Sequence, residues 1–309
     1  SALDSVVLDA LAHTPSSSRT PLPQLIQQYL ERAGHVLDAQ LPYEPTPPAD
    51  RAVVFDSPSG DGGICLVAHV AREGDRSKIT VSSGFAVAPR DGQPVVLTCA
   101  HTLEEIRWSP LLVLPVHNPS SPLAPPDLPH ARSSGTLLLV PSAAKDNERP
   151  PLSAHPVSAV LSSLHRSDLL LLGCPAPTPL APLPVSPYPA QPGTRIRAHF
   201  VSEAPQEGWR PWVGGMYAKW VEGTVLGYRD FAGREAVPGT YDALSHMLFH
   251  PPPLAGSSGG PIVDEKTGAV VGVMLGTRMD NRVEGVRGWG VPAEAIYEMF
   301  SLPGLKLNK

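Results

Sequence analysis

The sequence predicts an all-β protein with a helical extension at its N-terminal end and a short helix near its C-terminal end. The chain of 309 residues contains 38 prolines, which interrupt helices and are tolerated at strand edges and in loops. Short apolar runs such as 95–98 and 169–172 have the composition of buried strands. Apolar residues at helical spacing occur in 22–33 and 293–300. Together these features favour strands joined by stiff loops, with helices at the two ends.

Composition limits the classes of partner. The 42% hydrophobic content is sufficient for a sizeable core. A net charge of −5 and an isoelectric point near 6.1 provide no basic surface for nucleic acid. No apolar run approaches the ~20 residues that a membrane-spanning helix needs. We therefore expect no nucleic-acid partner and no membrane span.

Residues 1–50 differ in character from the rest of the chain. The segment 22–33 predicts one amphipathic helix between proline-rich flanks. We expect this helix to pack on the body of the protein. Binding of a partner or self-association through the helix is the alternative.

Strands and loops alternate through the remainder. Residues 195–201 and 220–228 alternate between apolar and polar side chains and predict strands. Residues 117–135 and 141–157 are rich in proline and serine and predict long surface loops.

Three segments carry residues suited to acyl-transfer chemistry. The strand-like run that begins at Val95 ends in His101, which places the imidazole at a strand rim. Asp168 stands directly before a second apolar run. Ser258 lies in the turn Gly256-Ser257-Ser258-Gly259-Gly260-Pro261, where glycines allow backbone N–H groups to converge on one point.

Each residue has an ordinary structural explanation as well. His101 could be a rim histidine, Asp168 a turn residue before a strand, and Ser258 part of a glycine-rich hairpin. Together they fit one chemistry: a serine hydroxyl needs a base to accept its proton, and the base needs an acid to orient it. The combination favours a triad of His101, Asp168 and Ser258.

These segments resemble the chymotrypsin-fold, trypsin-like serine peptidases. Thr98-Cys99-Ala100-His101 is similar to the family's histidine motif, and Ser83-Gly84-Phe85 to the strand before it. The aspartate and serine segments match in the same chain order, and the resemblance covers roughly 50–300. It is closer to the intracellular HtrA-type branch, without the C-terminal peptide-binding (PDZ) domain, because only nine residues follow Phe300.

The resemblance implies two six-stranded antiparallel Greek-key β-barrels with an N-terminal helical extension and a short C-terminal helix. The expected division is an extension at 1–50, a first barrel at 51–180 with His101 and Asp168, and a second barrel with the C-terminal helix at 181–309 with Ser258. The implied activity is that of a serine endopeptidase acting on a protein or peptide through an acyl-enzyme intermediate.

The resemblance also suggests which groups would surround the substrate. The oxyanion hole would form at Gly256, Ser257 and Ser258. The primary side-chain pocket would be lined by four residues of the strand after the nucleophile and the segment before it: Met274, Leu275, Gly276 and Pro252. No acid stands at a convincing position in these segments, so an apolar or small side chain is the expected preference.

Two departures from secreted relatives bear on compartment and activation. Cys99 has no partner cysteine on the preceding strand, and the three cysteines are an odd count, which indicates reduced thiols and an intracellular compartment such as cytosol, nucleus or organelle matrix. Ser257 stands where those relatives have an acid, so activation by a freed N-terminus is not expected.

The sequence is also compatible with functions other than peptide hydrolysis. The remaining histidines show no ligand spacing with Cys, Asp or Glu, so neither a metal nor another cofactor is expected. A catalytically silent member of the fold that serves as a binding scaffold, or a component of a complex, is the main alternative. An esterase elbow is disfavoured because that fold orders its triad Ser, Asp, His.

Overall fold

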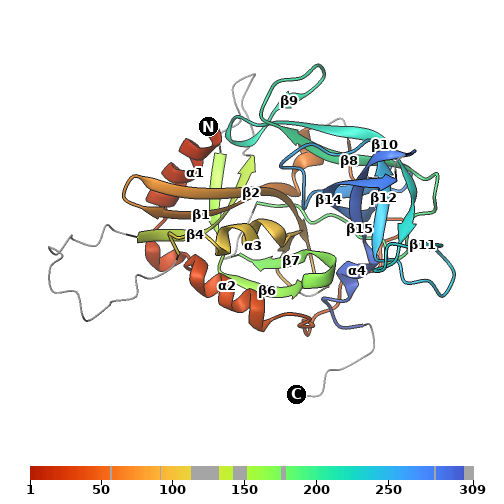
Figure 1. Ribbon diagram of the computed structural model, residues 1–309, viewed down its shortest axis with the longest axis horizontal. Helices are drawn as coiled ribbons and strands as arrows, with labels where there is room; N and C mark the ends of the chain where they lie inside the picture. Colours follow the sequence, from red (N-terminus) through yellow and green to blue (C-terminus); the bar gives the residue numbers. More distant parts are fainter. Residues whose placement is uncertain are drawn as a thin grey trace, which may run out of the picture.

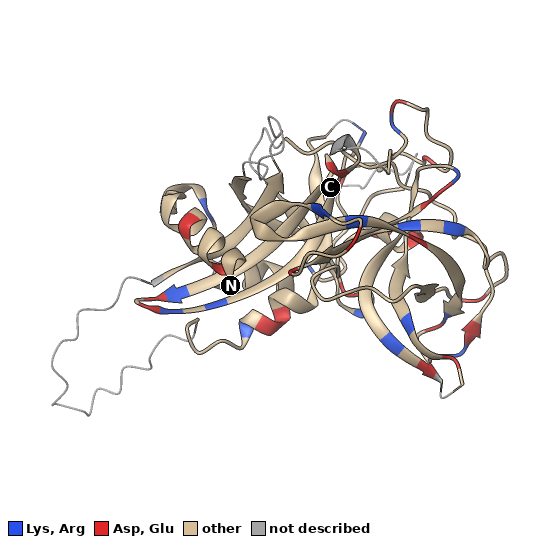
Figure 2. Cartoon of the chain, turned by 90° about the horizontal axis from the view of Figure 1, so that it is seen from above, with Lys and Arg blue, Asp and Glu red and all other residues tan. Residues whose placement is uncertain are grey.

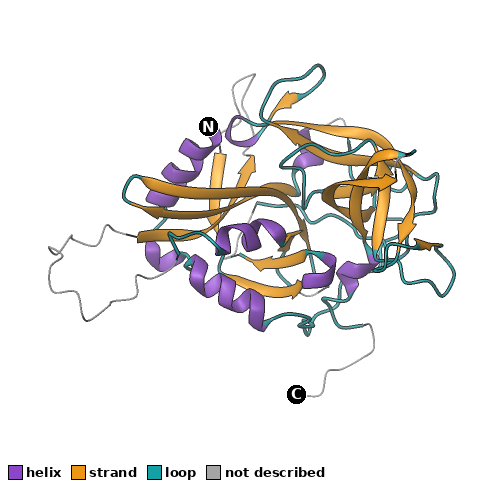
Figure 3. Cartoon of the chain, in the orientation of Figure 1, coloured by secondary structure: helices purple, strands orange, loops and turns teal. Residues whose placement is uncertain are grey.

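Two antiparallel β-sheets lie side by side in the computed structural model, one built from 64–173 and the other from 195–292 (Figure 1). The structure describes residues 1–55, 58–90, 92–112, 132–141, 152–174, 179–281 and 283–302. Most helices gather around the first sheet (Figure 3). The predicted all-β, chymotrypsin-like class is confirmed.

The first sheet contains seven strands in the order β5-β4-β1-β2-β3-β7-β6. Their bounds are β1 Ile64–Glu73, β2 Arg76–Val87, β3 Val95–Cys99, β4 Arg132–Pro141, β5 Leu152–Pro156, β6 Ala159–Leu164 and β7 Leu169–Gly173. Six were expected; the additional strand β5 pairs with the outer edge of β4. Among the described residues no pairing joins the two ends of this sheet.

Both faces of the first sheet are buried. Alternate residues of its strands enter two separate cores, as Leu66 and Val67 of β1 show. One face is covered by α2 (Leu22–Glu31) and α3 (His101–Arg107). This explains the continuous apolar run in β7, because a strand buried on both faces has no reason to alternate.

The second sheet closes on itself as a barrel. The ring runs β8-β10-β12-β15-β14-β13 and returns to β8, which pairs with both β13 and β10. The bounds are β8 Arg195–Ser202, β10 Tyr217–Arg229, β12 His246–His250, β13 Pro261–Asp264, β14 Val270–Asn281 and β15 Gly285–Pro292, with the two-residue strands β9 Arg210–Pro211 and β11 Glu235–Ala236 outside the ring. Its interior holds a third apolar core that includes Phe249 and Ile262.

The N-terminal extension holds two helices where the sequence predicted one. In addition to α2, α1 spans Ala2–His13 and buries Leu3, Val7 and Leu11. The short C-terminal helix α4 spans Glu294–Tyr297, within the segment predicted to be helical.

The two predicted loops are partly wrong. Residues 132–135 belong to β4, where they pair with β1. Residues 152–156 form β5, which pairs with 137–141 of β4 as a hairpin. The other residues of the two predicted loops, 117–131 and 142–151, lie outside the described residues.

Charges of both signs are interspersed over the chain (Figure 2). Among the described residues, no helix has the length and apolar character needed to cross a bilayer. The three cysteines, Cys65, Cys99 and Cys174, are free thiols.

Candidate active site

Strand register places His101 beside Asp168. In the antiparallel pair of β3 and β7, Cys99 lies opposite Leu169. The residue after β3 and the residue before β7 are therefore neighbours, and the Ala100 N–H donates to the Asp168 carbonyl at 3.0 Å. His101 begins α3 directly afterwards, at the rim of the sheet, as predicted.

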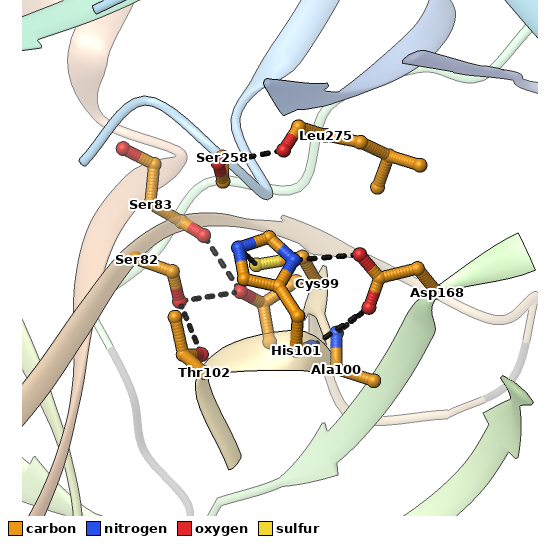
Figure 4. A network of polar contacts seen from close by, with 10 residues as sticks. Ser82, Ser83, Cys99, Ala100, His101, Thr102, Asp168, Ser258 and Leu275 are labelled. Atoms are coloured by element: carbon orange, nitrogen blue, oxygen red, sulfur yellow. Dashed lines mark hydrogen bonds and ion pairs between the residues drawn. The ribbon is translucent and has the colours of Figure 1, made fainter. Parts of the chain in front are cut away.

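The Asp168 carboxylate is held by three N–H donors. One oxygen accepts from the backbone N–H groups of Ala100 at 2.9 Å and His101 at 2.7 Å. The other lies 2.6 Å from Nδ1 of His101 (Figure 4). This arrangement fixes the tautomer that carries a proton on Nδ1 and leaves Nε2 for chemistry.

The electrostatic surroundings favour the protonated form of His101. The Asp168 carboxylate, and after it the Cys99 thiol, raise the pKa of His101 to about 10, although partial burial acts in the opposite direction. The Cys99 sulfur lies 3.6 Å from Nε2. The resting imidazole therefore needs to lose a proton before it can serve as a base.

The serine loop is fastened to the first sheet by its backbone. The Ser83 N–H donates to the Ser258 carbonyl at 2.8 Å, and the Ser83 hydroxyl donates to the Gly256 carbonyl at 2.9 Å. Gly259 has a φ of +82°, and a Cβ there would stand 2.2 Å from the Ser83 carbonyl oxygen. Only glycine fits this junction, which brings Ser258 to the end of β3 where His101 begins.

The Ser258 hydroxyl donates to the Leu275 carbonyl at 2.8 Å. A triad predicts that the His101 imidazole lies within hydrogen-bonding reach of both Asp168 and Ser258, or slightly beyond it in an unliganded protein. The structure shows the bond to Asp168, while the Ser258 hydroxyl is bonded to Leu275. Figure 4 shows Ser258 on the side of the imidazole away from Asp168. Rotation about one single bond in the side chain would redirect the hydroxyl.

Two backbone N–H groups beside Ser258 are free. Among the described residues, the N–H groups of Gly256 and Ser258 donate to no protein acceptor. Ser257 is engaged differently: its N–H donates to the Leu254 carbonyl at 3.2 Å, and its buried hydroxyl accepts from the Val201 N–H at 3.0 Å. Ser257 thus holds the loop in shape. Of the three residues expected to form the oxyanion hole, Gly256 and Ser258 have backbone N–H groups that can face a ligand, and Ser257 does not.

The expected pocket residues have separate positions. Met274 is buried and its backbone brackets the serine loop, accepting from the Gly259 N–H at 2.7 Å. Leu275 provides the carbonyl that holds Ser258, and a Cβ on Gly276 would lie 3.9 Å from the Ser258 hydroxyl. Pro252 lines a separate cavity together with Lys219.

A cleft of about 620 Å³ borders the serine loop at Gly256. Its walls come from the start of α1, β2, α3, the end of β8 with the segment after it, Met216 and the segment before the nucleophile. They include Leu3, Asp4, Ile79, Thr80, Val81, Leu254, Ala255 and Gly256. The cleft therefore begins at the candidate oxyanion donors and runs between the two sheets.

Sequence reasoning missed two contributors to this site. Ser83 was recognised as part of a strand, but its double attachment to the serine loop was not. Cys99 was treated as evidence about compartment, although its sulfur adjoins Nε2 of His101. The available signal for Cys99 was its spacing: it stands two residues before a histidine at a strand end, where the two side chains can lie close together.

Known proteins provide an independent comparison. The solved structure of the active form of the Rv3671c protease from M. tuberculosis is 20% identical, with 86% of this chain and 93% of that chain covered and a TM-score of 0.42. Deg5 is 13% identical over 76% of this chain and 86% of its own, with a TM-score of 0.47. The MamO protease domain from Magnetospirillum magneticum is 17% identical, with 75% of this chain and 93% of that chain covered and a TM-score of 0.41. No curated protein sequence matches the chain.

A family model for the trypsin-like peptidase domain matches residues 82–273. This range is more than half of the chain and contains His101, Asp168 and Ser258. The match agrees with the closed antiparallel barrel and with the order of the three residues along the sequence. The chain belongs to the family of trypsin-like peptidase domains.

Proposed function

We propose that this protein is a serine endopeptidase that cleaves protein or peptide substrates through Ser258, His101 and Asp168. The observation that supports this most is the Asp168 carboxylate, which holds Nδ1 and the backbone of His101 together at 2.6 and 2.7 Å. An acid bonded in this way orients the imidazole and stabilises its charged form during proton transfer.

Nε2 of His101 first gives its proton to solvent, because the raised pKa keeps the resting imidazole protonated. The Ser258 hydroxyl then leaves the Leu275 carbonyl and turns toward the free Nε2. Its oxygen attacks the substrate carbonyl carbon, and its proton passes to Nε2. The negative charge that forms on the carbonyl oxygen accepts hydrogen bonds from the free N–H groups of Gly256 and Ser258. Each such donor is typically worth ~10²–10³ in rate.

Collapse of the tetrahedral intermediate breaks the peptide bond. His101 gives its proton from Nε2 to the departing amine, and the acyl group remains on Ser258 as an ester. Water then attacks this ester by the same route, with His101 again accepting a proton, and the carboxylic acid product leaves. Asp168 stays ionised throughout.

The cleft beside Gly256 supports an endopeptidase in particular. Its volume of about 620 Å³ leaves space for several residues beyond the scissile bond. A polypeptide that enters between α1 and β2 would place its carbonyl next to the free N–H groups of the serine loop.

The alternative is a silent member of the family that binds partners without cleaving them. The bond from Ser258 to Leu275 and the raised pKa of His101 favour this alternative, because both oppose proton transfer in the resting state. The two functions differ in whether peptide bonds are broken.

Unfolded casein provides the test. We expect the wild-type protein to generate new N-termini, identified by mass spectrometry, at a rate that falls at least ~10³-fold in Ser258→Ala. His101→Ala should cost a similar factor, and the double variant no more than either single one, since the two side chains act as a unit. Equal cleavage by wild type and Ser258→Ala would assign the activity to a contaminant and favour the silent alternative.

A further inference from the structure

A cavity of about 480 Å³ lies on the second barrel, outside the triad. Its walls are formed by β8, β10, the segment between β8 and β9, and the segment before the nucleophile. The residues that bear on the argument are Phe200, Trp209, Lys219, Val221, Pro252 and Leu254. The lining combines these apolar side chains with polar ones, so the cavity has room and surface for a small amphipathic molecule.

Lys219 is the unusual member of this lining. It is half-buried, and among the described residues its ammonium group has neither a hydrogen-bond acceptor nor a carboxylate partner. A Cβ on Gly208 would lie 3.1 Å from the Lys219 nitrogen, so the ammonium lies against the backbone of the segment between β8 and β9. An ammonium group on a partly buried stem, with no carboxylate partner among the described residues, is able to bind an anion.

The other charges of the cavity are already paired. Arg197 bonds Glu265 at 2.9 Å and Glu222 at 3.0 Å, and Glu222 also lies 3.8 Å from Arg195. Arg197 and Glu222, both in the lining, therefore neutralise one another. Lys219 leaves the cavity with one uncompensated positive charge.

Two aromatic residues of the lining border this charge, Phe200 from the buried core of the barrel and Trp209 from a half-buried position. Phe200 lies directly opposite Lys219 in the antiparallel register of β8 and β10, which places the two side chains on one face. Trp209 is half-buried on the segment that leads to β9. We propose that this cavity binds a small organic carboxylate, its charged end on Lys219 and its apolar body against Phe200 and Trp209.

The cavity shares a wall with the catalytic loop. Leu254 lines it, and the Leu254 carbonyl accepts the Ser257 N–H at 3.2 Å, one residue before Ser258. A ligand that packs on Leu254 would restrict the segment that carries the candidate oxyanion donors. Occupation should therefore change the rate at which Ser258 is acylated, and this consequence rests on the proposed function.

Isothermal titration calorimetry with 3-phenylpropanoate tests the binding directly, without any need for activity. We expect saturable binding to wild type at one site, unchanged in Ser258→Ala and weakened about tenfold or more in Lys219→Met, which retains the apolar stem and removes the charge. Lys266→Met is the matched control, since Lys266 is an exposed lysine of the same barrel. The uncharged amide, 3-phenylpropanamide, should bind the wild-type protein with about the same weak affinity as the carboxylate shows for Lys219→Met.

Equal affinity of wild type and Lys219→Met, or of the acid and its amide, would overturn the proposal. The absence of measurable binding to folded wild type would do so as well. The link to the catalytic loop has its own readout: saturating 3-phenylpropanoate should change the acylation rate of Ser258 by a fluorophosphonate in wild type and not in Lys219→Met. An unchanged wild-type rate, with binding demonstrated, would contradict the link alone.

Discussion

Asp168 has a backbone φ of 53°, the one positive value at a non-glycine position in the described part of the chain. A left-handed conformation costs an L-residue roughly 1–2 kcal/mol, and Asp tolerates it better than most. The strained conformation lets the carboxylate accept from three N–H donors of Ala100 and His101 at once, and these bonds offset its cost. Backbone strain and bonding partners are thus concentrated at the residue that we propose orients the base.

The pH dependence of acylation should reflect the surroundings of His101. A general base works in its deprotonated form, and the pKa of His101 is raised from 6.5 to about 10 by Asp168 and then by Cys99. The acylation rate should therefore rise with pH well above 7. Cys99→Ala removes the second cause, so its rate profile should shift toward lower pH.

Stopped-flow acylation by a fluorophosphonate between pH 6 and 11 provides both profiles. Cys174→Ala is the control, since Cys174 is a free thiol distant in sequence from the site and is not among the causes of the shift. Superimposable profiles for wild type and Cys99→Ala would show that the thiol does not influence the base.

At the residue scale, the sequence predicted that His101 and Asp168 stand at neighbouring strand ends, but it did not predict the resting contact of Ser258. The choice of His101, Asp168 and Ser258 followed from strand-end and glycine-loop patterns, which are local. The bond from Ser258 to Leu275 depends on a carbonyl 17 residues away and on one freely rotating side chain. Nothing in a local pattern encodes which of two acceptors a hydroxyl selects.

Among the elements, α1 joins the two sheets. Its buried residues Val7 and Leu11 belong to the core that also contains strands of the first sheet and parts of the second. Leu3 packs on the short helix at Val213–Gly215. A Cβ added to Gly214 would lie 2.5 Å from a terminal methyl carbon of Leu3. The helix therefore holds the outer wall of the cleft beside Gly256 in position.

Removal of the Leu11 side chain should destabilise the protein. Leu11 is 2% exposed, and Leu11→Ala leaves a cavity that costs about 3 kcal/mol of unfolding free energy. The exposed residue Asp9 on the same helix provides the control, with an expected change below about 0.5 kcal/mol for Asp9→Ala. Urea denaturation gives both values; equal losses would mean that α1 contributes little to the core.

The elements were predictable to different degrees. The helix within 22–33 was found because its apolar spacing is clear and prolines mark its start. The helix α1 was missed, although Leu3, Val7 and Leu11 repeat every four residues, because Asp, Ser and Val weaken its intrinsic preference and packing supplies the rest. Strand β5 was read as loop because it pairs at a sheet edge, where half-buried residues give little pattern.

On the scale of the whole molecule, a buried carboxylate connects the two halves. Asp61, just before β1, accepts from Arg210 at 2.6 Å and from the Trp220 indole at 3.1 Å, and both donors belong to the second sheet. The Asp61 side chain is 5% exposed. This bond ties the first sheet to the second independently of α1.

Loss of that carboxylate should weaken the molecule as a whole. Asp61→Ala leaves the buried Trp220 indole and the partly exposed Arg210 guanidinium without this acceptor and should cost about 3 kcal/mol of unfolding free energy. Glu44→Ala removes the more exposed pair with Arg51 and should cost less than about 1 kcal/mol. The same urea titrations measure both, and an Asp61→Ala protein as stable as Glu44→Ala would show that this contact does not join the sheets.

The central claim is that His101 and Asp168 activate Ser258, and intact-mass spectrometry after treatment with a fluorophosphonate tests it most directly. The account predicts one adduct on wild type, none on Ser258→Ala, and strongly slowed labelling of His101→Ala. Unlabelled wild type that is folded would contradict the claim, as would equal labelling of wild type and Ser258→Ala.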